Sequence, residues 1–227
     1  MLRNPELILD LSIFSLQDRG GISVVWGEYL KHMPDIIDGF SRVTLLLPNA
    51  NNMILDNLSI DKFNYKRIRR KGKYSKYLPS LLSGSKGDVL HMSYYGWYPL
   101  FKGKKIVTVH DFTHEIYATG LQRVLHNYLK RISVMSADVI LCISETTKTD
   151  LLHFYPGVDE IKTIRVILNA VGSKFYPENS PKISGDIPYL LWVAGRECGR
   201  QQNGWCIAGD WHGIAALSAR SYGRPMT

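Results

Sequence analysis

Short apolar runs alternate with amphipathic stretches along most of the chain. The runs are rich in Val, Ile and Leu and have the length of buried strands. They lie at 7–12, 42–47, 88–92, 105–110, 138–143 and 164–168. Between them, apolar side chains recur at helical spacing in residues 22–33 and 120–136, and residues 145–154 are predicted to form a helix between Ser144 as N-cap and the segment Tyr155-Pro156-Gly157. This alternation is typical of a parallel sheet covered by helices on both faces, and it predicts an α/β fold, a Rossmann-like doubly wound sheet, over residues 1–176.

A change of pattern comes after this predicted domain. Proline and glycine punctuate residues 177–188, which indicates a linker. The run YLLWVAG then predicts a buried strand, so a second α/β domain is expected to start within 189–197. Residues 198–227 contain no lysine and hold two of the three cysteines. Our hypothesis is that a frameshift or truncation near Glu197 left a tail that is not native to the fold; an unusual native tail is the alternative.

The composition is that of a soluble globular protein, with 45% hydrophobic and 21% charged residues. No apolar run approaches the roughly 20 residues of a membrane-spanning helix, and the first residues lack the pattern of a signal peptide. The three cysteines, Cys142, Cys198 and Cys206, form neither an even disulfide framework nor a close metal-binding pair. These features together predict a reduced, cytoplasmic protein.

The net positive charge is the feature of the composition that suggests an anionic binding partner. The net charge is +8, and part of the excess lies in a basic run over residues 62–76. This run includes Lys62, Lys66, Arg67, Arg69, Arg70 and Lys71. Contact with anionic lipid at the inner membrane face and a merely solvated surface are both open. Tyrosines interleaved with these cations suggest a nucleic-acid-binding module as a third interpretation, but no recognised nucleic-acid-binding motif occurs and we expect no nucleic acid partner.

Two predicted strand ends carry candidate chemistry. Gly20 and Gly21 join the first strand to the first helix, where the backbone can approach a phosphate and the helix N-terminus attracts negative charge. Simple turn chemistry is the alternative for these glycines. His110 and Asp111 end the strand at 105–110, at the edge where open α/β sheets bind ligands. The alternative for His110 is a buried histidine that is satisfied by its neighbours.

An aromatic loop comes directly after the strand at 88–92. It contains Tyr94, Tyr95, Trp97 and Tyr98, whose ring faces could stack on a sugar or a base. A packed surface loop is the alternative interpretation, and the sequence favours neither.

The order of these motifs resembles that of glycosyltransferase family 4 over residues from about 7 to 197. The matching segments are Gly20-Gly21-Ile22, His110-Asp111, Ser136-Ala137-Asp138, Ile167-Leu168-Asn169 and Phe175-Tyr176-Pro177. The resemblance is strongest to mannosyltransferase-like bacterial members that build cell-surface polysaccharides. It implies a GT-B fold of two Rossmann-like domains, of which this chain supplies the N-terminal, acceptor-binding one.

The resemblance also implies roles for individual residues. Gly20 and Gly21 would face the diphosphate of a nucleotide-sugar donor, and Arg196 would neutralise charge that grows there. His110, with Asp111 beside it, would contact the donor sugar at the reacting centre. The family transfers sugars with retention and without a metal or other cofactor. The acceptor would be a saccharide or a lipid-linked saccharide, met on one side by the aromatic loop.

Part of the family pattern is missing from the chain. The lysine expected shortly after Arg196 is absent, and residues 198–227 contain no counterpart of the family's paired-glutamate motif. We therefore expect this chain alone to lack transferase activity. A non-catalytic domain that recognises saccharide or anionic membrane is the alternative function.

Overall fold

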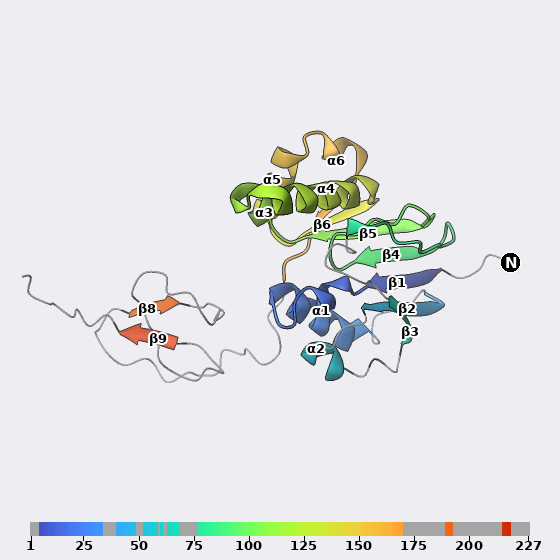
Figure 1. Cartoon of the computed structure of the whole chain (residues 1–227), viewed down its shortest axis with the longest axis horizontal. Coiled ribbons are helices and arrows are strands. Elements are labelled where there is room, and N and C mark those ends of the chain that lie inside the picture. Colours follow the sequence, from blue (N-terminus) through green and yellow to red (C-terminus); the bar gives the residue numbers. More distant parts are fainter. Residues whose placement is uncertain are drawn as a thin grey trace, which may run out of the picture. The chain divides into compact units, whose positions relative to one another are not determined.

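The computed structural model describes residues 5–33, 40–48, 52–58, 60, 63–68, 77–169, 189–192 and 215–218. The chain divides into two compact units, Met1–Ser173 and Lys174–Thr227. The first unit contains a parallel sheet with helices on its two faces (Figure 1). This arrangement confirms the predicted α/β, Rossmann-like fold.

Seven strands form the sheet within the described part of the first unit. They are β1 (Glu6–Asp10), β2 (Arg42–Pro48), β3 (Asn64–Ile68), β4 (Val89–Met92), β5 (Lys104–Val109), β6 (Val139–Cys142) and β7 (Thr163–Val166). Their order across the sheet is β3-β2-β1-β4-β5-β6-β7, and all neighbouring strands are parallel. The order reverses between β1 and β4, which is the position where doubly wound sheets bind ligands at the carboxyl ends of their strands.

The helices cover the sheet in two groups. The described helices are the 3-10 helix η1 (Ser12–Ser15), α1 (Gly21–His32), α2 (Met53–Asp56), α3 (Thr113–Tyr117), α4 (Gly120–Ser136), α5 (Glu145–Phe154) and α6 (Val158–Ile161). Helices α1 and α2 contribute Trp26, Leu30 and Leu55 to the core on one face. Helices α4 and α5 contribute Leu129 and Leu151 to the core on the other face. The central strands are therefore buried between two layers of helices, as their apolar sequences require.

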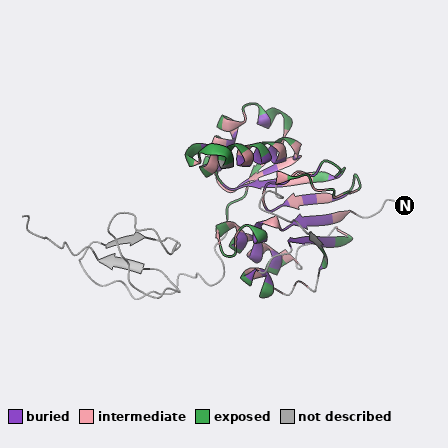
Figure 2. Cartoon of the chain, in the orientation of Figure 1, coloured by how far each residue is buried: buried purple, intermediate pink, exposed green. Residues whose placement is uncertain are grey.

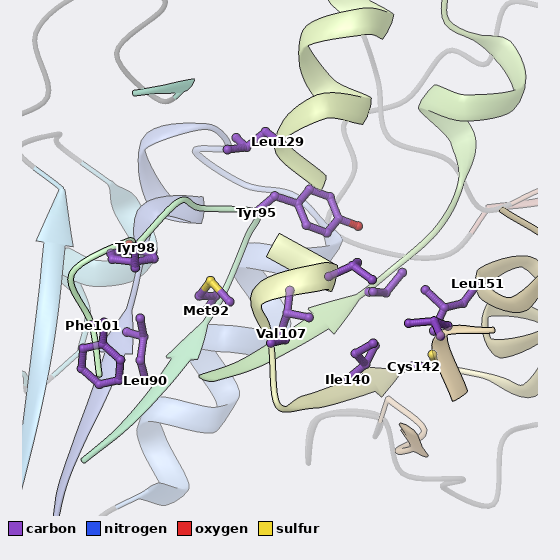
Figure 3. Close-up of a cluster of buried hydrophobic side chains, with 14 of the residues drawn as sticks. Leu90, Met92, Tyr95, Tyr98, Phe101, Val107, Leu129, Ile140, Cys142 and Leu151 are labelled. Carbon is purple, nitrogen blue, oxygen red and sulfur yellow. The ribbon is translucent and has the colours of Figure 1, made fainter. Parts of the chain in front are cut away.

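Alternation along the strands divides the core into two clusters. Leu7 and Leu9 of β1 pack with α1 and α2, whereas Ile8 between them joins the cluster beneath α4 and α5. Buried residues accordingly concentrate in the strands (Figure 2). The second cluster is drawn in Figure 3, where the labelled strand residues are Leu90, Met92, Val107, Ile140 and Cys142.

The six predicted strands and three predicted helices of the first unit are confirmed, with ends that differ by at most two residues. The sequence pattern does not predict β3, because its segment NYKRI lies in the basic run and lacks apolar character. As an edge strand, β3 pairs only with β2 and can carry charged side chains in solvent. Lys66 is exposed there, so part of the basic run is an edge strand with a solvated side.

Helix α4 spans the predicted residues but buries only part of the apolar stripe that its spacing suggests. Leu121, Val124 and Tyr128 are exposed, whereas Lys130 and Ser133 are buried. The sheet contacts α4 through a different side, which includes Leu129 and Val134 of the core. The apolar pattern therefore predicts the helix correctly and its buried face only in part.

The second unit contains the strand predicted from YLLWVAG. Strand β8 (Tyr189–Trp192) pairs antiparallel with β9 (Ala215–Ser218), which lies within the tail at 198–227. The linker at 177–188 and most of the tail lie outside the described residues, so the domain boundaries and the frameshift hypothesis stay predictions. No helix in the described part of the chain is long and apolar enough to cross a bilayer.

Candidate functional site

The candidate site lies at the carboxyl ends of β1, β4 and β5, on both sides of the reversal in strand order. Buried Ser93 connects the turns at these ends. Its N–H donates to the carbonyl of Asp10 at 3.0 Å, and its hydroxyl accepts from the N–H of Ile13 at 3.3 Å. The turn after β1 and the turn after β4 are thereby fixed to each other, so groups that they carry keep a constant geometry.

The glycine turn leads directly into α1. Gly20 is the N-cap, and the Ser23 hydroxyl accepts from the Gly20 N–H at 2.8 Å and donates to the Gly20 carbonyl at 2.9 Å. A Cβ at Gly20 would collide with the Gln17 carboxamide, whereas a Cβ at Gly21 would meet nothing within 4 Å. The turn therefore packs tightly on one side and leaves open space on the other. A phosphate could approach the first-turn N–H groups of α1 through this space.

His110 is buried at the end of β5, with 7% of its surface exposed. Burial lowers the pKa of His110 to about 4, against the opposing effects of Asp111 and of a hydrogen bond to the Ser93 backbone. The imidazole is therefore neutral at pH 7. Its Nε2 is buried and has no hydrogen-bond partner among the described residues. A neutral imidazole that donates through its other nitrogen offers this atom as an acceptor for a hydroxyl group.

A buried ion pair lies beside the segment after β5. The Lys130 side chain on α4 is fully buried, and its Nζ lies 2.9 Å from Glu115 Oε1 on α3. Lys130 also donates to the carbonyl of Asp111 at 2.6 Å and lies 3.4 Å from the centroid of the Phe112 ring. Burial lowers the pKa of Lys130, although Glu115 and Asp111 oppose this effect. One ammonium group thus holds the segment from 111 to 115, directly after His110.

The family model for glycosyltransferase family 4 matches residues 19–174, which is more than half of the chain. The chain belongs to glycosyltransferase family 4. The matched region starts just before the glycine turn and includes α1, the His110 strand end and the buried ion pair. Membership of this family implies sugar-related substrates. No curated protein matches the chain.

Within this family 4 domain, Asp111 has a structural partner. Its Oδ1 accepts from the N–H of Thr113 at 2.9 Å, which forms a local turn just before α3. The side chain is otherwise exposed at the carboxyl edge. The structure therefore shows Asp111 shaping the turn, and its assignment as a catalytic residue stays a prediction.

The aromatic loop of the family 4 domain is largely core. Tyr95 and Tyr98 are buried in the cluster beneath α4, so their ring faces are covered and cannot stack on a ligand (Figure 3). Tyr94 and Trp97 are half-buried, and the Tyr94 hydroxyl lies 3.0 Å from His126 Nε2. Of the four predicted acceptor-side residues, only Tyr94 and Trp97 therefore remain candidates for contact with an acceptor.

Several predicted site residues of the family 4 chain are not tested. Arg196, Lys62, Arg69, Arg70 and Lys71 lie outside the described residues. Arg67 falls in β3, but its side chain is not described. Among the described residues, no group of three or more His, Cys, Asp or Glu side chains could hold a metal ion, and metal independence stays a prediction.

Sequence reasoning missed Lys130 and Glu115. Most apolar residues of α4 recur on one side of the helix, which makes Lys130 on the other side look solvent-facing. Glu115 lies in α3, a helix of five residues that is too short to give a periodic signal. The pair becomes evident only when α3 folds back against α4.

Proposed function

We propose that this chain supplies the acceptor-binding half of a retaining glycosyltransferase of cell-surface polysaccharide biosynthesis. The enzyme would transfer a sugar, with mannose as the first candidate, from a nucleotide-sugar donor to a saccharide or lipid-linked acceptor in the cytoplasm. The main nucleotide site would belong to the family's second domain.

One observation carries the proposal: an open helix N-terminus and a buried acceptor nitrogen lie at the same sheet edge. The space beside Gly21 gives access to the first turn of α1, and His110 Nε2 has no partner among the described residues. A diphosphate is attracted to the first site by the helix dipole and its N–H groups. A sugar hydroxyl would donate to the second, which requires that binding uncovers this buried nitrogen. A nucleotide sugar contains both groups in one molecule.

The chemistry assigns a task to each feature. In transfer with retention, the acceptor oxygen bonds to the anomeric carbon on the face from which the diphosphate departs. The bond between that carbon and the phosphate oxygen breaks, its electron pair stays on the phosphate, and the acceptor proton passes to the departing phosphate oxygen. Fixed dipoles at the α1 N-terminus stabilise the charge that grows there. His110 orients the sugar, and Arg196 would add a cation from the second domain.

The residues that would contact the acceptor are proposed only from their position in the domain. Trp97 and Tyr94 are the two rings of the aromatic loop that keep exposed surface. Aromatic rings suit the apolar faces of sugars, and their polar atoms can bind hydroxyl groups. A saccharide acceptor at this loop would approach the donor sugar from the β4 side of the site.

A titration followed by amide NMR tests the donor part of this proposal. The whole chain would be titrated with UDP-glucose and, separately, with GDP-mannose. We expect resonances of Gly20 to Ser23 and of His110 to shift, with a Kd of about a millimolar because one helix N-terminus and one histidine make few contacts with the ligand. Gly21→Val fills the open space and should abolish the shifts. Gly87→Val is the matched control, since a Cβ at Gly87 also meets nothing within 4 Å.

Two results would contradict the proposal. Shifts that lie away from the carboxyl edge, or that persist unchanged in Gly21→Val, would remove the glycine turn from the donor site. Micromolar binding to the isolated chain would show that its own residues form the main nucleotide site, against the division of labour proposed above.

A further inference from the structure

An apolar stripe runs along the solvent side of α4. It consists of Leu121, Val124, Tyr128 and Met135, which succeed one another at intervals of three, four and seven residues. These side chains share one face of a helix and are between 41% and 67% exposed. Figure 2 shows exposed residues along this helix. Single exposed apolar residues are common on protein surfaces, but a continuous row indicates a binding surface.

Helix α3 extends the stripe. Ile116 and Tyr117 at its end are 51% and 77% exposed, and α3 packs against α4. The α3–α4 stripe is defined by Ile116, Tyr117, Leu121, Val124, Tyr128 and Met135. It has a tyrosine near its start and a second one at mid-length. Tyrosine combines an apolar ring with a polar tip, which suits a boundary between apolar and aqueous phases.

The exposed charges that α3 and α4 themselves carry are positive, although exposed Asp111 lies two residues before the start of α3. Arg123 and Arg131 are exposed on α4, which contains no Asp or Glu. The single acidic residue of α3 is Glu115, which is buried against Lys130. Within these two helices, no exposed carboxylate can therefore pair with a cation from outside, whereas two guanidinium groups can pair with anions.

We propose that the α3–α4 stripe docks on the surface of a membrane that contains anionic lipid. The apolar side chains would enter the boundary between headgroups and acyl chains, with α4 parallel to the membrane plane. Arg123 and Arg131 would pair with lipid phosphates. A second copy of the chain fits the surface less well, because Arg123 and Arg131 would face the same two arginines of the other copy with no exposed carboxylate on α3 or α4 to pair with them.

This contact differs from the one predicted from sequence. The basic run at 62–76 suggested anionic lipid through charge alone, whereas the α3–α4 stripe combines apolar area with charge. The stripe and α1 belong to opposite faces of the sheet, since α4 packs on one core cluster and α1 on the other. Membrane contact through α4 would therefore leave the α1 side of the domain away from the bilayer.

Vesicle flotation with the whole chain tests the proposal. Vesicles of phosphatidylcholine alone would be compared with equimolar phosphatidylcholine and phosphatidylglycerol. We expect flotation only with the anionic vesicles. Val124→Glu should reduce the partition coefficient roughly tenfold or more. Val24→Glu adds the same charge at an exposed valine of α1 on the opposite face and should bind within about twofold of the unchanged chain.

Several outcomes would overturn the proposal. These are failure of the unchanged chain to float, equal binding to both vesicle types, or equal loss in the two valine variants. If Val124→Glu fails to fold by circular dichroism, the double variant Arg123→Glu and Arg131→Glu replaces it and should also lose anionic binding. A dimer in light scattering that Val124→Glu abolishes, without vesicle binding, would assign the stripe to a second copy. Flotation needs neither donor nor acceptor, so its result is independent of the proposed function.

Discussion

Replacing Lys130 by methionine tests the buried ion pair most directly. Methionine retains most of the side-chain length but removes the charge, which in the native chain lies 2.9 Å from Glu115 Oε1 and 2.6 Å from the Asp111 carbonyl. Glu115, only 5% exposed, would then be left with an unpaired charge. Removing one partner of a buried pair costs about 3–5 kcal/mol, and we expect Lys130→Met to lower the free energy of unfolding by about this amount.

Urea unfolding at pH 7, monitored by circular dichroism, measures this loss. The double variant Lys130→Met and Glu115→Leu is the decisive comparison, because an apolar pair in place of a buried ion pair is often nearly neutral. We therefore expect the double variant to be more stable than Lys130→Met alone by about 2 kcal/mol or more. The reasoning is refuted if the double variant loses the sum of both single effects, or if Lys130→Met costs less than about 1 kcal/mol.

Two further predictions concern a buried histidine after β5 and a buried serine on α4. The folded pKa of His110 is about 4, below its ordinary value of 6.5, so the unfolded chain binds more protons between these values and stability falls as pH drops through this window. This group lowers the free energy of unfolding at pH 5 by about 2 kcal/mol. Urea unfolding at pH 7.5 and pH 5 measures the drop in the free energy of unfolding between the two pH values, and this drop should be smaller by about 2 kcal/mol in His110→Gln than in the unchanged chain. Ser133→Ala removes a buried hydroxyl that accepts from the Gly96 N–H at 2.8 Å and donates to the Gly96 carbonyl at 2.9 Å. It should cost about 1–3 kcal/mol in thermal unfolding, whereas Ser136→Ala, which loses a single bond of 3.3 Å, should cost less than about 1 kcal/mol.

Most of the sheet could be predicted from the sequence because its strands are buried on both faces. Such strands are apolar throughout, so 42–47 and 105–110 stand out without any knowledge of their neighbours. Strand β3 could not be found in this way. It lies at the sheet edge, where a strand needs apolar residues on fewer sides and where NYKRI is tolerated.

The candidate site was predictable in part. The glycine turn and His110 come after apolar strands, and the turns that leave parallel strands gather at the carboxyl edge of their sheet. The aromatic loop shows the limit of this reasoning. Tyr95 and Tyr98 have the same residue type as Tyr94, and only the packing of α4 over the loop decides that two of the three rings are buried.

The sequence by itself determined the order of strands and helices, the position of the glycine turn and the motifs of family 4, because these depend on residues that are close along the chain. The tertiary structure alone decided which side of α4 faces the sheet. Helix α4 has apolar residues on both sides, so its periodicity cannot say which side is covered. Leu129 is buried in the core cluster, Lys130 against α3 and Ser133 against the loop after β4, whereas Val124 and Tyr128 stay in solvent. Which face a helix buries depends on the neighbours that surround it, and those neighbours come from distant parts of the chain.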